Sequence, residues 1–301
     1  MPDRNRDLTA KLMLVGLIIA WGLTWPAMRF ALFEMPPFSM RFVSMGLGAA
    51  TLFVILRLQR RALRVEGGIA WAHVAVAGLF NIVGFSVLAA FAQLTAGTSR
   101  VVILAYTMPI WASLLARPIL GERLNSARAA ALALCVAGMT VLIYPLAGAG
   151  LPGGILLAIG AAMSWAAGTV YLKWARIDGD PITVAAWQLV VGFLIVTLGL
   201  PFFEGWPHLW PLHWPALVSV IFVGIVGSGI AYLLWFDIIT RLPAMTASLG
   251  VLSVPMIGVV ASVLLFGERP TLSDLIGFAL IFAASACVLL ASSERAPPEP
   301  T

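Results

Sequence analysis

The chain has 301 residues, of which 61% are hydrophobic and only 10% are charged. Soluble domains have about 45–50% apolar and about 25% charged residues, so this composition excludes a soluble enzyme, a nucleic-acid-binding domain, a disordered chain and a fibre. It favours a protein whose solvent is largely lipid. The net charge of +5 is then better explained by basic cytoplasmic loops than by a nucleic-acid partner.

Ten apolar stretches are long enough to cross a membrane as helices, which takes about 20 residues each. They cover residues 12–33, 38–56, 69–91, 99–119, 127–147, 153–173, 182–203, 215–236, 244–266 and 271–291. Membrane strands are shorter, at about 9–11 residues, and alternate strictly, which these stretches do not. The expected fold is therefore an all-α polytopic membrane protein with ten transmembrane helices.

Flanking charges predict the orientation. The first stretch follows Arg4, Arg6 and Lys11, as a signal peptide would, but it has no small-residue cleavage site and is expected to be retained. With segment 1–11 in the cytoplasm, only four of the 18 Lys and Arg residues fall at outer ends of spans: Arg29, Arg41, Arg100 and Arg269. This bias places both termini in the cytoplasm. The polar, Pro-rich tail 292–301 is expected to be disordered.

The second half of the sequence repeats the first. The turn Gly121-Glu122-Arg123 recurs as Gly267-Glu268-Arg269, 146 residues later. Other features recur in the same order at offsets of 144 or 146: Gly16 as Gly160, Trp21 as Trp165, Arg29 as Lys173, Gly78 as Gly224 and Pro109 as Pro255. The repeat predicts five helices in 12–147, a linker at 148–152 and five helices in 153–291.

Five is an odd number of spans, so the second repeat must enter the membrane from the opposite side. Such inverted repeats usually form a substrate site at their interface, near the middle of the membrane. Rocking one half against the other then exposes that site to each side in turn. The first Gly-Glu-Arg turn is expected to face the cytoplasm and the second the outside.

Three motifs of the first repeat have counterparts in the second. They are Ala20-Trp21-Gly22 with Ser164-Trp165-Ala166, Met40-Arg41-Phe42 with Trp187-Gln188-Leu189, and the two prolines Pro109 and Pro255 before their Gly-Glu-Arg turns. In these motifs the chain resembles the EamA-type family of the drug/metabolite transporter superfamily, over about residues 10–292. The resemblance implies ten helices around a central cavity, often in exporters of amino acids or other metabolites, and it does not specify a substrate.

Two helical faces present aromatic residues followed by a cation. Trp21, Trp25 and Arg29 share one face, and Trp165, Thr169 and Lys173 repeat the spacing. In the functional interpretation the aromatic and hydroxyl side chains line the cavity. Arg29 and Lys173 then lie at its two mouths and attract an anionic group such as a carboxylate. In the alternative, the tryptophans pack between helices and the cations reach lipid phosphates.

Two symmetry-related prolines lie inside apolar stretches. Proline removes a backbone donor and frees a carbonyl one turn upstream, which membrane helices tolerate beside protein or a water-filled cavity. Pro109 and Pro255 are therefore predicted hinges, with a fixed structural bend as the alternative.

Polar side chains deep in a span are costly and often functional. Asn81 is predicted to face the cavity for this reason. Tyr106, Tyr232 and Trp235 are predicted to face it as well, because aromatic residues with a polar tip suit a cavity wall. The alternative is adhesion between helices, which is the preferred interpretation for the serines.

Acidic residues are scarce within the spans. Glu122 and Glu268 lie in turns, where each is expected to pair with its neighbouring arginine or cap the next helix. The related four-span multidrug antiporters depend on a buried glutamate, and this sequence has no evident equivalent. Asp237, at the inner end of the eighth span, is the residue predicted to couple transport to protons.

Motifs typical of enzymes are lacking. The sequence has three histidines and no metal-binding, nucleophile-elbow, phosphate-loop or dinucleotide motif. Cys135 and Cys287 are expected to be packing residues. No catalytic residue, metal site or cofactor is therefore expected.

The leading hypothesis is an inner-membrane transporter that exports an amino acid or related metabolite by alternating access. It is expected to act as a monomer, with a small-molecule substrate and membrane lipids as partners. One alternative is a multidrug or lipid-linked-sugar translocator of the same superfamily. The alternative from another class is a receptor or scaffold, which is less favoured because no soluble sensory domain accompanies the spans.

Overall fold

The computed structural model describes residues 2–121, 126–145, 153–207, 209, 211–242 and 250–293. Every regular element in these ranges is a helix. Seven helical stretches are long and apolar enough to cross a membrane, and three shorter apolar helices accompany them. The prediction of an all-helical membrane protein with ten helices is confirmed. The expected linker 148–152, the residues Glu122 and Arg123, and positions 294–301 of the expected tail lie outside the described residues.

The first half contains five apolar helical segments, which correspond to its five predicted spans. They are α1 (Pro2–Leu32), α2 (Pro37–Leu58), α3 (Gly68–Gly78) continued by η1 (Leu79–Gly84) and α4 (Phe85–Thr95), α5 (Thr98–Ala105) followed by α6 (Met108–Leu120), and α7 (Ser126–Ile143). Helix α1 begins well before the expected residue 12. The reason is that no Gly or Pro interrupts the polar residues before the first apolar stretch, so the helix extends through them.

The second half follows the same plan. Its helices are α8 (Gly153–Ala175), α9 (Pro181–Phe203), α10 (Trp214–Phe222) continued by η3 (Val223–Ile230) and α11 (Ala231–Arg241), α13 (Val254–Phe266), and α14 (Leu272–Ser293). Helix α14 thus continues into the first two residues of the expected tail, Ser292 and Ser293.

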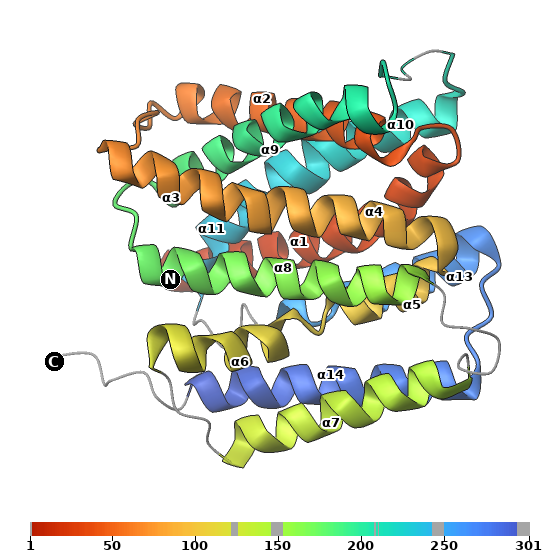
Figure 1. Ribbon diagram of the computed structural model, residues 1–301. Coiled ribbons are helices and arrows are strands. Elements are labelled where there is room, and N and C mark those ends of the chain that lie inside the picture. The colour runs from red at the N-terminus through yellow and green to blue at the C-terminus, as the bar shows by residue number, and fades with distance from the viewer. Residues whose placement is uncertain are drawn as a thin grey trace, which may run out of the picture.

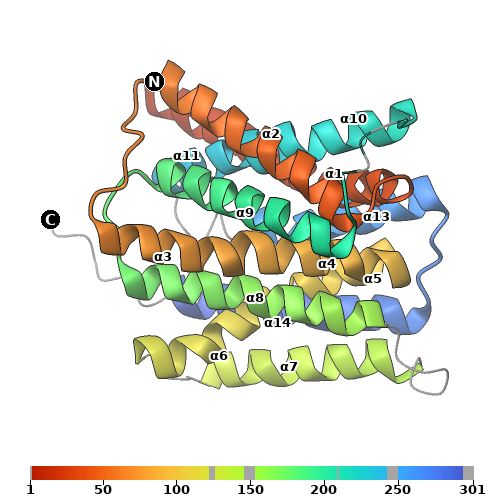
Figure 2. The same ribbon diagram turned by 45° about the horizontal axis from the view of Figure 1, so that its top comes forward.

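The helices lie side by side in one bundle, and α1 and α8 run in opposite directions along it (Figure 1). Helix α1 begins and α14 ends at the same end of the bundle, here called the proximal end, and α1 ends at the distal end. Helices α7 and α14, the last of each half, lie together along the lower edge in Figure 1, and Figure 2 shows α7 at this edge with α14 partly behind α8. They approach closely because Gly138 and Gly277 face each other's backbone carbonyls.

Irregular backbone occurs at matching places in the two halves. The third span of each contains a π-helical segment, η1 in the first half and η3 in the second. The fourth span is interrupted at Tyr106–Thr107 and at Leu252–Ser253, just before α6 and α13. These paired breaks show that the two halves share one structural plan in addition to the spacing of their sequences.

Candidate functional site

Three of the predicted site residues meet where α1 packs against α11. The edge of Trp21 faces Tyr232, with ring centroids 6.3 Å apart, and the Trp235 ring lies 6.0 Å from Trp21. The indole N–H of Trp21 donates to the backbone carbonyl of Gly227, at 3.2 Å. We call Trp21, Tyr232 and Trp235 the first aromatic group.

A second aromatic group lies one turn further along α1. Phe85 of α4 stands between two tryptophans, with its centroid 6.2 Å from Trp25 and 5.0 Å from Trp165 of α8, both edge-on. Tyr106 packs against the buried cluster that contains Trp25. Trp25, Phe85 and Trp165 form the second aromatic group, in which Phe85 was not foreseen, since a single Phe among apolar residues gives no signal.

The two groups are related by the repeat. Trp21 and its counterpart Trp165 each lie on the first helix of their own half and pack against the third span of the other half, at Tyr232 and Phe85 respectively. The aromatic residues thus lie at the interface between the halves, which is where inverted-repeat carriers usually hold substrate.

Side chains from these first helices also bind the π-helical segments. The Ser164 hydroxyl donates to the carbonyl of Phe80 in η1 at 2.7 Å, as Trp21 does to Gly227 in η3. A π-helical turn departs from the regular α-helical hydrogen-bond pattern, and such turns are frequent at functional sites. No sequence signal separated η1 or η3 from ordinary helix.

Asn81 lies in η1 and is buried against the second half. Its Nδ2 donates to Oε1 of Gln188 on α9 at 3.3 Å, while its Oδ1 has no hydrogen-bond partner among the described residues. Asn81 also packs directly on Gly168 of α8. The equivalent contact between α1 and η3 joins Thr24 to Gly227. In both contacts, a polar side chain packs on a glycine where a first helix meets the π-helical segment of the other half.

The remaining members of the two predicted faces lie elsewhere. Thr169 is exposed on α8, one turn beyond Trp165. Lys173 is exposed near the proximal end of α8. The Arg29 guanidinium lies 5.2 Å from the centre of the Phe33 ring, near the distal end of α1. These three residues are not part of the two aromatic groups.

The two predicted hinges occupy equivalent positions. Pro109 and Pro255 are each the second residue of the helix that follows the break, α6 or α13. A proline fits the first turn of a helix, where its missing N–H needs no partner. The matched glycines Gly121 and Gly267 end these helices in the left-handed conformation, at φ 70° and 64°.

Asp237, the predicted coupling residue, lies near the proximal end of α11. Its carboxylate forms an ion pair with Arg241 one turn later, at 2.9 Å, and its side chain is 27% exposed. The only other carboxylate in the ten apolar helical segments of the described chain is Asp274, which Arg100 binds through two hydrogen bonds.

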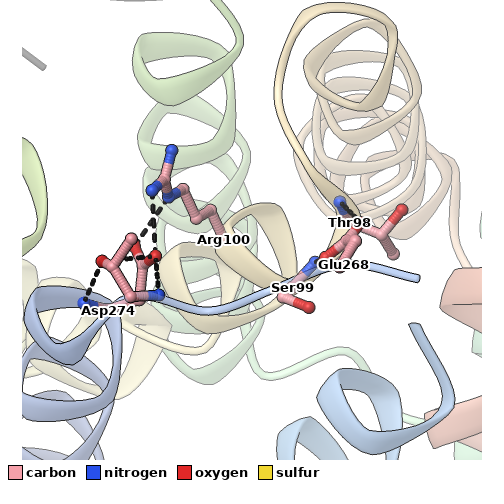
Figure 3. A network of polar contacts seen from close by, with 6 residues as sticks. Thr98, Ser99, Arg100, Glu268 and Asp274 are labelled. Atoms are coloured by element: carbon pink, nitrogen blue, oxygen red, sulfur yellow. Dashed lines mark hydrogen bonds and ion pairs between the residues drawn. The ribbon is translucent and has the colours of Figure 1, made fainter. Parts of the chain in front are cut away.

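A polar network joins the halves at the distal end (Figure 3). The Glu268 carboxylate accepts hydrogen bonds from the backbone N–H groups of Thr98 and Ser99, at 2.7 and 3.0 Å. The expectation that Glu268 caps the next helix was wrong, because it caps α5 of the other half. The Arg100–Asp274 pair lies beside it, with Nε–Oδ1 at 2.7 Å.

Another carboxylate makes a similar contact. Glu204, just after α9, accepts hydrogen bonds from the backbone N–H groups of Phe38 and Ser39 at the start of α2. The distal end is therefore held by carboxylates of the second half that bind helix N-termini of the first, a favourable charge arrangement.

Arg41 is a buried residue that was not among the predicted site residues. It is only 7% exposed and lies among α1, α2 and α4. From the sequence alone, Arg41 was counted among the cations at outer ends of spans, and its place as the fourth residue of the predicted span 38–56 was the available signal. Gln93, fully buried beside Trp25, was not among the predicted site residues either. No group of three or more metal-ligating side chains occurs among the described residues.

Comparison with known proteins shows relatives that match nearly the whole chain. The uncharacterized transporter YoaV of Bacillus subtilis is 24% identical over 273 residues, which cover 89% of this chain and 92% of its own. A probable amino-acid metabolite efflux pump of Salmonella typhimurium is 25% identical over 284 residues, which cover 89% of this chain and 90% of its own. A solved crystal structure superimposes with a TM-score of 0.65 at 27% identity, over 96% of this chain and 99% of that one.

The EamA-like transporter family matches both halves, at residues 8–144 and at residues 152–290. The match covers nearly the whole chain and repeats once. The protein is thus a multi-pass membrane transporter that acts on a small molecule, not an enzyme, and it belongs to the EamA-like transporter family.

Proposed function

We propose that this transporter exports an amino acid or a related small metabolite across a bacterial inner membrane by alternating access. The proposal rests on the two aromatic groups at the interface between the halves. A compound that passes between the halves meets Trp21, Trp25, Trp165 and Tyr232, whose rings offer apolar area and polar tips. The relative described as a probable amino-acid metabolite efflux pump supports this substrate class.

The paired contacts support the proposal of alternating access. Each first helix is tied to the third span of the opposite half, so rocking of one half against the other changes both sets of contacts together. The breaks before Pro109 and Pro255 are the proposed hinges. Asn81, Tyr106, Thr169 and Trp235 complete the proposed substrate path, with Arg29 and Lys173 at its mouths.

The proposed orientation has the proximal end in the cytoplasm, and with it both termini. The support is the distribution of cations, because the proximal loop after α2 alone carries Arg60, Arg61 and Arg64. The carrier is proposed to act as a monomer of two repeats, 12–147 and 153–291.

The test is flux into proteoliposomes that contain the purified protein. The vesicles are offered labelled amino acids, hydrophobic organic cations and a lipid-linked sugar. Saturable amino-acid flux that is abolished by Trp21→Ala and by Trp165→Ala supports the proposal. Flux of hydrophobic cations or lipid-linked sugar alone indicates the other superfamily activities. Binding of an amino acid without any flux contradicts export and favours a receptor.

A further inference from the structure

Arg41 lies in the second turn of α2 and has neutral partners. Its Nε donates to the backbone carbonyl of Ser86 on α4 at 3.0 Å. One of its terminal nitrogens, Nη2, contacts the sulfur of Met28 on α1. A thioether is a weak hydrogen-bond acceptor, so the positive charge receives little compensation from these contacts.

No carboxylate of the described residues pairs with Arg41. The acidic groups at this end of the bundle have other partners: Glu34 binds His213, Glu204 binds the start of α2, Glu268 binds the start of α5, and Asp274 binds Arg100. Arg41 is thus a buried cation that the described part of the protein does not neutralise.

Burial of such a charge within a membrane protein is costly, and ionisable residues at these positions usually serve transport. Attachment to a lipid phosphate does not explain Arg41, because the residue is only 7% exposed. A guanidinium has five N–H donors in a planar fork that matches a carboxylate. The contacts with Ser86 and Met28 leave donors of Arg41 for an anionic partner.

The surroundings of Arg41 indicate what that partner carries besides charge. Met28 follows Trp25 by one helical turn on α1, and Ser86 directly follows Phe85 on α4. Both residues that contact Arg41 therefore adjoin the second aromatic group. We therefore expect an anionic group that binds Arg41 to bring the rest of a small molecule close to that group.

We infer that Arg41 binds the carboxylate of the transported compound, which selects carboxylate-bearing amino acids over amines and amides. The carboxylate replaces the weak contact with Met28 and supplies the missing counter-charge. This inference rests on the proposed function, and it adds a residue that fixes the chemical class of the substrate.

The first test uses the unaltered protein in proteoliposomes. Leucine, phenylalanine, threonine and serine are compared with their primary amides, which keep the ammonium group and the side chain but lack the carboxylate. Flux per unit concentration is expected to be about 10- to 100-fold lower for each amide, the range expected for loss of a charge-assisted hydrogen bond. Equal flux of acid and amide overturns the inference but leaves amino-acid transport intact. No saturable flux of any amino acid overturns the proposed function and the inference together.

The second test assigns the selectivity to one residue. Arg41→Gln is expected to raise the KM for the acid about 10- to 100-fold and to leave flux of the amide within about twofold, so that selectivity is lost. Arg41→Lys is expected to restore part of it. The control is Arg57→Gln, an exposed arginine at the proximal end of α2, which keeps full selectivity. Equal losses of acid and amide flux in Arg41→Gln, with normal thermal unfolding, indicate a purely structural arginine and overturn the inference.

Discussion

The indole N–H of Trp21 donates to the carbonyl of Gly227 at 3.2 Å, across 206 positions of sequence. Its counterpart is the bond from Ser164 to the carbonyl of Phe80 at 2.7 Å. In both cases the first helix of one half binds the π-helical segment of the other. The two halves are therefore linked at equivalent points beside the aromatic groups.

The first prediction separates the hydrogen bond of Trp21 from its ring. Trp21→Phe keeps an aromatic ring against Tyr232 and Trp235 but removes the donor to Gly227, so it is expected to cost about 0.6 kcal/mol of unfolding free energy. Trp21→Ala also removes the ring and is expected to cost about 3–5 kcal/mol. Denaturant unfolding in detergent micelles measures both. Equal losses in the two variants are the result that contradicts a packing role for the ring.

The second prediction concerns Gly168, where a methyl group would collide with Asn81. Gly168→Ala is expected to destabilise the protein by about 1–3 kcal/mol, because both residues lie on packed helices and neither backbone can easily withdraw. Gly160→Ala is the matched control on α8, since its added carbon lies 3.5 Å from Leu88, an ordinary contact. Thermal unfolding in micelles compares the two. A Gly168→Ala protein as stable as the control argues against close packing of α8 on η1.

The spans and the two halves could be predicted from the sequence, because apolar stretches and repeated motifs can be recognised without knowing which residues are in contact. The apolar stretches identified the spans, and the offset between Pro109 and Pro255 identified the two halves. The sequence predicted that Trp21 and Tyr232 both face the cavity, but it did not predict that their rings contact each other.

Long-range pairing could not be predicted in this way. Glu268 was assigned to a local role, yet its partners Thr98 and Ser99 precede it by about 170 positions. A carboxylate accepts from any exposed helix N-terminus, and the sequence does not say which terminus lies nearest. Arg41 was missed for the same reason, because its burial depends on α1 and α4 and not on its own helix.

The third prediction concerns proton coupling by Asp237. Replacing its carboxylate by an amide in Asp237→Asn is expected to make flux independent of pH, because the variant has no carboxylate to exchange a proton at this position. Asp178→Asn, at an exposed position just beyond α8, is the control and is expected to keep the wild-type profile. The measurement is initial flux into proteoliposomes with equal pH on both sides. An unchanged profile in Asp237→Asn excludes this residue as the coupling site.

The fourth prediction concerns the distal network of Glu268. In alternating access the contacts that close one end must break when that end opens, so weakening them favours the open state. Glu268→Gln keeps the shape of the side chain but removes the charge that binds the start of α5. If the closed state loses about 1.4 kcal/mol of stabilisation relative to the open state, the population of a minor open state rises about tenfold.

Opening is measured at Val101 on α5, which is fully buried next to this network. Val101→Cys is introduced into a protein in which Cys135 and Cys287 are alanine, and a membrane-impermeant maleimide is added to reconstituted vesicles. Glu268→Gln is expected to increase the labelling rate about tenfold, whereas Glu66→Gln, in the exposed proximal loop after α2, is expected to leave it unchanged. Because labelling requires the distal end to open, equal rates in the parent and in Glu268→Gln are evidence that Glu268 does not hold it closed.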